Sequence, residues 1–96
     1  MVIKSYPRVI NEVIKNRLLK AAVDKGKVNS LEGLSEKLGK TKTYLSSSFN
    51  KDRIISLTIV YDCAKIIECE VPPLIPFTEE VDMYIKSLYG DVDMVN

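Results

Sequence analysis

Apolar side chains recur along this chain at intervals of three and four residues, in five separate segments. An α-helix has 3.6 residues per turn, so such an interval places the apolar side chains of a segment on one face. No segment shows the sustained alternation of apolar and polar residues that indicates a strand. We therefore expect an all-α fold, a compact bundle of about five helices that cover residues 7–24, 31–38, 42–50, 56–69 and 79–89.

The first expected helix begins at Pro7, because the missing N–H of a proline costs nothing in a first helical turn. Its buried stripe is made of the apolar residues Val9, Ile10, Val13, Ile14, Leu18, Leu19, Ala22 and Val23. Gly26 ends the helix, and Lys25 and Lys27 flank the negative end of its dipole.

The second and third helices are short and are joined at Gly39, which can adopt the positive φ that a tight turn needs. Ser30 and Thr41 are their expected N-caps. Ser35 is small, as a close approach of two helices requires. The residues expected to face the core are Leu31, Leu34, Ser35, Leu38, Leu45 and Phe49. The residues expected on the other side of the third helix are Lys42, Thr43, Ser46, Ser47 and Asn50.

Two further helices follow, with Ser56 and Thr78 as expected N-caps. The inward residues of the first are Leu57, Val60, Tyr61, Ala64, Ile66 and Ile67, and those of the second are Val81, Tyr84, Ile85, Leu88 and Tyr89. Pro72, Pro73 and Pro76 stop a helix and favour an extended linker between the two. We therefore divide the chain into a helical domain, residues 1–71, and a Pro-rich linker with a C-terminal helix, residues 72–96.

The net charge of +1 hides a strong division along the chain. Residues 1–53 carry twelve Lys and Arg against five acids, a charge of +7, whereas residues 54–96 carry two against eight, a charge of −6. A basic part and an acidic part indicate separate roles, although a solvated surface alone would also account for them.

Several functions are not expected. The chain has no His, no nucleophile–base pair, no glycine-rich phosphate loop, and no metal-ligand spacing around Cys63 and Cys69. Glu79 and Glu80 are consecutive, so on a helix they point apart. We expect neither catalysis nor a cofactor. Lys4 and Arg8 interrupt the apolar start, and no apolar run has membrane-spanning length, so a cytoplasmic protein with two free thiols is expected.

Residues 34–71 resemble the lambda repressor-like family of DNA-binding domains, which includes phage Cro proteins, phage repressors and antitoxins. The resemblance is carried by Leu34, Ser35, Lys37-Leu38-Gly39, Leu45, Phe49-Asn50 and Ala64-Lys65-Ile66. Its motif core comprises Leu34, Ser35, Leu38, Gly39, Leu45 and Phe49. Ser35 stands where the family commonly has Ala, and Ser48 where an apolar residue usually packs. Leu31 lies near the position of a phosphate-holding glutamine in the family.

The resemblance implies a helix-turn-helix whose third helix, residues 42–50, enters the DNA major groove. It implies base contacts from Lys42, Thr43, Ser47 and Arg53. The resemblance also implies a contact of Asn50 with the DNA backbone. Further backbone contacts are expected, by position and chemistry, from Lys40, Tyr44 and Lys51. Simpler roles remain open: Lys42 as a solvated lysine, Thr43 as support for the cap, and Tyr44 packed on the second helix.

The expected function is sequence-specific binding of double-stranded DNA by a homodimeric repressor of phage, plasmid or bacterial type. The candidate dimer surface is Tyr84, Ile85, Leu88 and Tyr89, with packing on the first or fourth helix of the same chain as the alternative. Two other functions remain open, a protein–protein interaction module without DNA binding and an antitoxin. An antitoxin would bind its toxin through the acidic C-terminal part, and the same acidic surface could recruit a basic protein partner such as polymerase.

Overall fold

The helical pattern of the sequence is realised in a computed structural model that describes residues 5–90. Within this range the chain forms five α-helices, one 3-10 turn and no strand. The elements are α1 (Tyr6–Asp24), α2 (Leu31–Lys37), α3 (Tyr44–Phe49), α4 (Leu57–Ile67), η1 (Pro72–Leu74) and α5 (Thr78–Tyr89). The expected all-α fold is confirmed, with one helix in each predicted segment.

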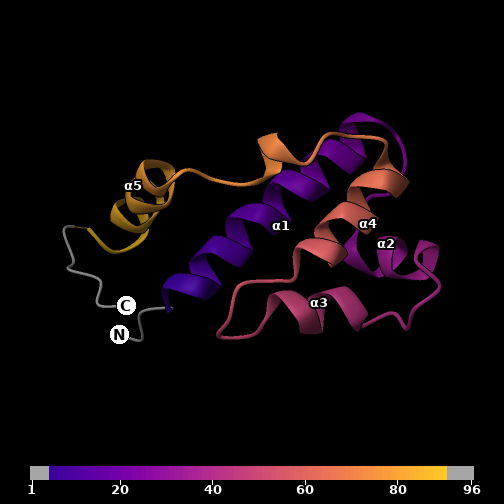
Figure 1. Cartoon of the computed structure of the whole chain (residues 1–96), viewed down its shortest axis with the longest axis horizontal. Helices are drawn as coiled ribbons and strands as arrows, with labels where there is room; N and C mark the ends of the chain where they lie inside the picture. The colour runs from indigo at the N-terminus through magenta and orange to yellow at the C-terminus, as the bar shows by residue number, and fades with distance from the viewer. Residues whose placement is uncertain (1–4, 91–96) are drawn as a thin grey trace.

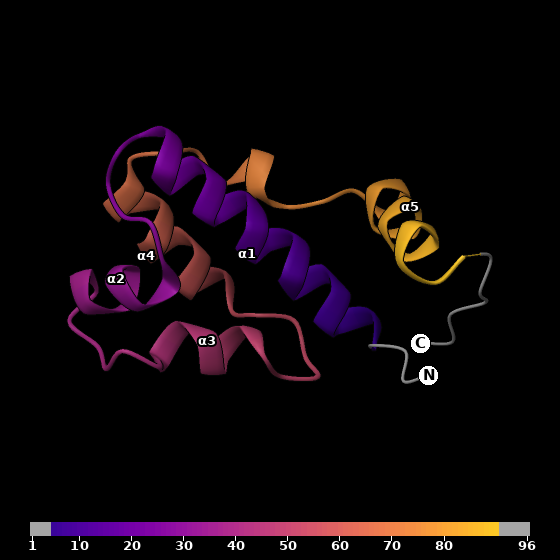
Figure 2. The same ribbon diagram turned by 180° about the vertical axis from the view of Figure 1, so that it is seen from behind.

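Helix α1 is the longest element, and the other helices are arranged along it (Figure 1). Helices α2, α3 and α4 gather on one part of α1, whereas α5 lies at the other end of the molecule. The reverse view shows the same separation (Figure 2). This arrangement gives an elongated molecule with principal extents of 39 × 23 × 20 Å.

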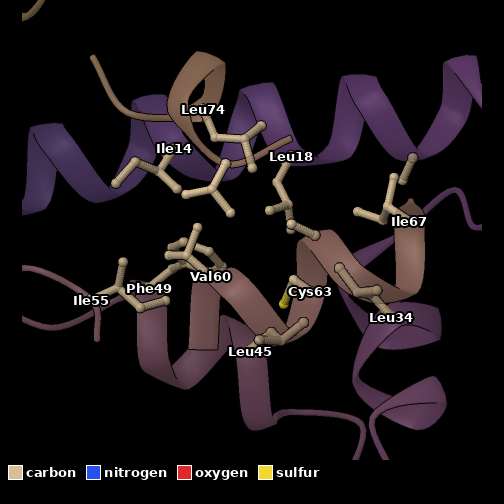
Figure 3. Close-up of a cluster of buried hydrophobic side chains, with 13 residues drawn as sticks. Ile14, Leu18, Leu34, Leu45, Phe49, Ile55, Val60, Cys63, Ile67 and Leu74 are labelled. Atoms are coloured by element: carbon tan, nitrogen blue, oxygen red, sulfur yellow. The ribbon is translucent and has the colours of Figure 1, made fainter. Parts of the chain in front are cut away.

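The main core lies where α1 meets α2, α3 and α4 (Figure 3). Leu18, Leu34 and Leu45 contribute one fully buried side chain each from α1, α2 and α3. The remaining buried members of this core are Ile14, Ala22, Phe49, Ile55, Val60, Cys63, Ala64, Ile67, Val71 and Leu74. The core positions predicted for Leu34, Ser35, Leu45 and Phe49 are thus confirmed.

The buried face of α4 differs from the predicted one. Leu57 and Tyr61 are 57% and 59% exposed, whereas Cys63 is fully buried. Helix α4 is apolar around most of its circumference, so the three-to-four spacing did not define a single inward face. Burial first, and then the negative charges that Asp62 and Cys69 carry when ionised, raise the pKa of Cys63 to about 12. Both cysteines are free thiols. Val23, expected in the α1 stripe, is also exposed.

Two predicted N-caps were wrong. The N–H of Tyr44 donates to the carbonyl of Thr41 over 3.1 Å, and this hydrogen bond closes a tight turn that contains Lys42 and Thr43. Helix α3 therefore begins at Tyr44 instead of residue 42, and no side chain caps it. In α5 the N-cap is Phe77 instead of Thr78, and the N–H of Phe77 donates to the Glu80 carboxylate over 2.7 Å.

The linker before α5 is not extended throughout. Pro72 to Leu74 form the 3-10 turn η1, whose φ angles a proline ring can adopt, and Leu74 is buried in the main core. The preceding helix α4 ends at Ile67, because Glu68 takes a left-handed conformation with φ of +63°.

Helix α5 packs on α1 of the same chain. Val81 and Ile85 form a small second core with Val9, separate from the main core. The Tyr84 hydroxyl donates to the Glu12 carboxylate over 3.0 Å, and Arg17 pairs with Glu80 over 3.1 Å. The Phe77 N–H and then Arg17 lower the pKa of Glu80, while burial and then Glu12 raise the pKa of Tyr84. No helix in residues 5–90 combines the length and apolar character needed to cross a membrane.

Candidate nucleic-acid interface

Helices α2 and α3 are joined by a turn that Ser35 holds together. The Ser30 hydroxyl caps α2 by accepting from the Gly33 N–H, and Gly39 has a φ of +76° in the turn. The buried Ser35 hydroxyl accepts from the Leu45 N–H over 3.1 Å and donates to the Leu31 carbonyl over 2.8 Å. Because Ser35 is small, it allows the expected close approach of α2 and α3. Its hydroxyl also provides an acceptor for the Leu45 N–H in the first turn of α3.

The residues expected at the start of the third helix lie in the turn before it. Lys42 and Thr43 are exposed, and the Lys42 ammonium is 3.7 Å from the Glu32 carboxylate. The side chains of this ion pair are 69% and 59% exposed, so the pair is too well solvated to hold Lys42 strongly. The Lys40 ammonium lies 5.5 Å from the centre of the half-buried Tyr44 ring, which also packs against the main core. The Tyr44 ring therefore packs on the main core while it also faces Lys40.

The serines of α3 are not equivalent. The Ser46 hydroxyl donates to the Thr43 carbonyl over 3.1 Å, and the Ser48 hydroxyl donates to the Tyr44 carbonyl over 2.8 Å. Ser48 can therefore occupy a partly buried position because its hydroxyl has a partner. Ser47 is exposed, and its hydroxyl has no hydrogen-bond partner within residues 5–90. Of these three hydroxyls, the Ser47 hydroxyl is thus the one whose O–H is not already donated within the described residues.

The segment after α3 is fixed by Asn11, a residue that the sequence analysis missed. Its fully buried amide donates to the Arg53 carbonyl over 2.8 Å and accepts from the Ile55 N–H over 2.8 Å. A longer bond of 3.4 Å reaches the Lys51 carbonyl. The backbone is held in this way while the side chains of Lys51 and Arg53 stay exposed. Asn11 precedes Ile14 by three positions and therefore lies on the buried face of α1. This position in the sequence could have identified it as a buried polar residue that needs partners.

Arg8 of α1 was also missed, and it meets the end of α3. Its guanidinium Nη2 donates to the Asn50 side-chain oxygen, while its Nε lies 3.8 Å from the Asp52 carboxylate. The Ser5 hydroxyl donates to the same carboxylate over 3.0 Å. These contacts fix the orientation of the exposed Asn50 side chain, one of the predicted backbone contacts.

A polar groove of about 340 Å³ lies between α1 and α3. Its α1 side is formed by Arg8, Glu12 and Lys15, which follow one another along one face of the helix. The opposite side and the ends are lined by Leu31, Ser46, Ser47, Phe49 and Asn50. The structure therefore brings Ser47 and Asn50 together with two cations that were not predicted site residues.

The remaining predicted contacts do not line this groove. Lys42 and Thr43 precede α3, whereas Lys51 and Arg53 follow it. Exposed cations therefore flank both ends of a short helix whose outer side carries hydroxyl and amide groups. Such an arrangement can bind an extended anion.

Comparison with protein-family models, with curated proteins and with solved structures finds no match to this chain.

Proposed function

We propose that this protein binds double-stranded DNA sequence-specifically through a helix-turn-helix of the lambda repressor-like type, formed by α2 and α3. The observation that carries this proposal is the packing of α3. Leu45 and Phe49 hold the helix on the core, and Ser35 ties it to α2, so that Ser47 and Asn50 lie on its exposed side. The role is binding without catalysis.

The proposed base contacts are Lys42, Thr43, Ser47 and Arg53. A lysine can donate to the O6 and N7 acceptors of guanine, and a threonine methyl can pack on thymine. Exposure of all four side chains is compatible with these contacts, and the Ser47 hydroxyl is unoccupied within the described range. Lys40, Tyr44, Asn50 and Lys51 would contact the DNA backbone.

Phosphate neutralisation makes DNA affinity depend steeply on salt. If about four to six cations per protomer meet phosphates, the log–log slope of affinity against salt for a dimer should be about −7 to −10. Binding that does not change with salt would contradict the proposal.

We further propose that the protein acts as a homodimeric repressor, because one such unit reads few base pairs and two units read half-sites about one DNA turn apart. The dimer would cover an operator and block polymerase. Within one chain, Ile85 is only 2% exposed and is used in packing on α1. Leu88, 45% exposed, is the member of the predicted dimer surface that stays most accessible to a second copy.

Selection of bound sequences from random duplex DNA tests the proposal directly. Enrichment of a defined motif is expected, and Lys42→Ala should then relax one base position at a cost of about 1–3 kcal/mol. The control Lys65→Ala removes the same charge from α4 and should leave the motif unchanged. Uniform weakening across all sequences would assign Lys42 to a phosphate, and failure to enrich any motif would exclude sequence-specific reading.

A second candidate function, binding of a protein partner, is favoured by exposed apolar side chains in α4 and just before it. Ile54, Leu57 and Tyr61 are each more than half exposed, at 56%, 57% and 59%. Exposed apolar side chains that lie close together often mark a protein contact. An antitoxin could use these side chains together with the acidic C-terminal part. A gel shift with random DNA at low salt separates the two functions, because a module without DNA binding gives no shift at micromolar protein.

A further inference from the structure

The groove between α1 and α3 contains donors that the fold itself does not use. The ammonium of Lys15 has no ion-pair or hydrogen-bond partner within residues 5–90, and the same holds for the hydroxyl of Ser47. Both groups line the groove. Leu31, at the first position of α2, gives it an apolar wall and no side-chain donor.

Arg8 determines which end of the Asn50 amide is available. An asparagine side chain has one acceptor oxygen and an NH₂ group with two donors. Because the Arg8 guanidinium occupies the oxygen of Asn50, the NH₂ group is left to donate to a ligand. Lys15, Ser47 and Asn50 thus provide one positive charge and several donors on two walls of one groove.

We propose that this groove binds a phosphodiester of the DNA backbone, held by Lys15, Ser47 and Asn50, with Arg8 as the positioning residue for Asn50. A phosphodiester has one negative charge and oxygens that accept several hydrogen bonds, which matches this donor set. The inference rests on the proposed DNA binding. It also assigns the Ser47 hydroxyl to a phosphate of the DNA backbone instead of to a base.

Glu12 lies in the same groove and opposes an anion. Its carboxylate accepts from the Tyr84 hydroxyl of α5, so the side chain is anchored by α5 while it lines the groove. Removal of its charge should therefore strengthen phosphate binding, whereas removal of the Lys15 charge should weaken it. Glu12→Gln and Lys15→Gln each place a neutral amide on α1. Because these two variants should change the affinity for phosphate in opposite directions, together they test the proposed site.

The experiment compares four full-length proteins, wild type, Lys15→Gln, Glu12→Gln and the control Lys20→Gln, by fluorescence anisotropy on a random-sequence duplex at several salt concentrations. Lys20 is an exposed lysine of α1 that does not line the groove. For Lys15→Gln we expect, for each bound protomer, the salt slope to shrink by about 0.9 and the affinity at 0.1 M salt to fall about eightfold. Glu12→Gln should bind about threefold more tightly, and Lys20→Gln should resemble wild type.

Equal behaviour of Lys15→Gln and Lys20→Gln, with wild type bound to DNA, would overturn the groove while leaving the proposed function intact. Absence of DNA binding by wild type would overturn both. Asn50→Asp gives a further check, because a carboxylate retains a partner for Arg8 but has no donor. This variant should bind at least about tenfold more weakly with its circular dichroism spectrum unchanged, and wild-type affinity would contradict the role of Asn50.

Nuclear magnetic resonance distinguishes the DNA backbone from a free anion. Addition of the random duplex should shift the side-chain amide signals of Asn50, whereas inorganic phosphate at the same ionic strength should not. An equal shift with inorganic phosphate alone would replace the proposed phosphodiester by a free phosphate ion.

Discussion

Asn11 shows how one buried polar side chain can organise a surface 40 residues away. It has no exposed area, and it binds the backbone of the segment that follows α3 through both ends of its amide. A buried polar group without partners is costly, so the segment and the asparagine stabilise each other. The positions of Lys51 and Arg53 depend on this bond set.

Asn11→Ala should therefore destabilise the protein more than an ordinary surface change. The Ile55 N–H and the Arg53 carbonyl would lose their partner, and the expected loss in free energy of unfolding is about 3 kcal/mol. Urea denaturation followed by circular dichroism measures this loss. The matched control is Asn16→Ala, an exposed asparagine of the same helix, which should change stability by less than about 0.5 kcal/mol. Equal effects of the two changes would show that the Asn11 bonds contribute nothing net.

Sequence reasoning at this scale succeeded where a residue acts through its neighbours in the chain. Ser30 and Ser56 cap their helices as predicted, because a cap bonds an N–H two or three positions later. It failed for Arg8, whose partner Asn50 is 42 positions away. A pattern among neighbouring residues of the chain cannot indicate a contact across such a separation in sequence.

At the scale of elements, the contact between α2 and α3 depends on one hydroxyl. Ser35 is both small enough for the approach and able to accept from Leu45 in the first turn of α3. Alanine in this position would keep the approach but leave that buried N–H without its partner.

We expect Ser35→Ala to lower the free energy of unfolding by about 1–3 kcal/mol, because a buried donor is left unsatisfied. Thermal and urea denaturation check this value. Ser46→Ala serves as the control, since the Ser46 hydroxyl is exposed and its loss should cost less than about 0.5 kcal/mol. A Ser35→Ala protein as stable as wild type would mean that α3 shifts to satisfy its N–H in another way.

Helix α4 marks the limit of prediction for elements. Its extent was nearly correct, since Ser56 and the apolar run define it locally. The prediction of its buried face was wrong, because two sets of apolar positions satisfy a helical spacing. One set is 57, 60, 61 and 64, and the other is 60, 63, 64 and 67. Packing on α1 and α2 selected the second set.

At the scale of the whole molecule, α5 is attached to the rest of the chain by a small core of its own. Val81 and Ile85 pack on Val9, while the main core is built without residues of α5. The acidic helix thus lies at the end of the molecule away from α2 and α4 (Figure 1).

Removal of residues 77–96 should leave a chain that still unfolds cooperatively, with a free energy of unfolding lower by about 1–3 kcal/mol. The lost apolar burial is partly offset by the conformational entropy of a helix that no longer has to be ordered. Urea denaturation measures the loss, and non-cooperative unfolding would show that α5 belongs to the main folding unit. Solution mass adds a second result, because an unchanged dimer would exclude α5 as the main dimer contact.

Full-length Leu88→Glu is the companion to this truncation. Leu88 is 45% exposed, so a charge there should spare the packing of α5 on α1 and disrupt only a contact with a second copy. If α5 forms the dimer, this variant should be monomeric with nearly unchanged stability.

The sequence by itself determined the number, order and approximate extent of the helices, the turn at Gly39 and the charge division. Each of these follows from residues a few positions apart, through helical periodicity, capping hydrogen bonds and glycine geometry. The tertiary structure alone decided which face of α4 is buried, how Asn11 holds the segment after α3, and that Arg8 and Lys15 share a groove with Ser47 and Asn50. Those outcomes depend on contacts between segments distant in the chain, which form only when the helices pack.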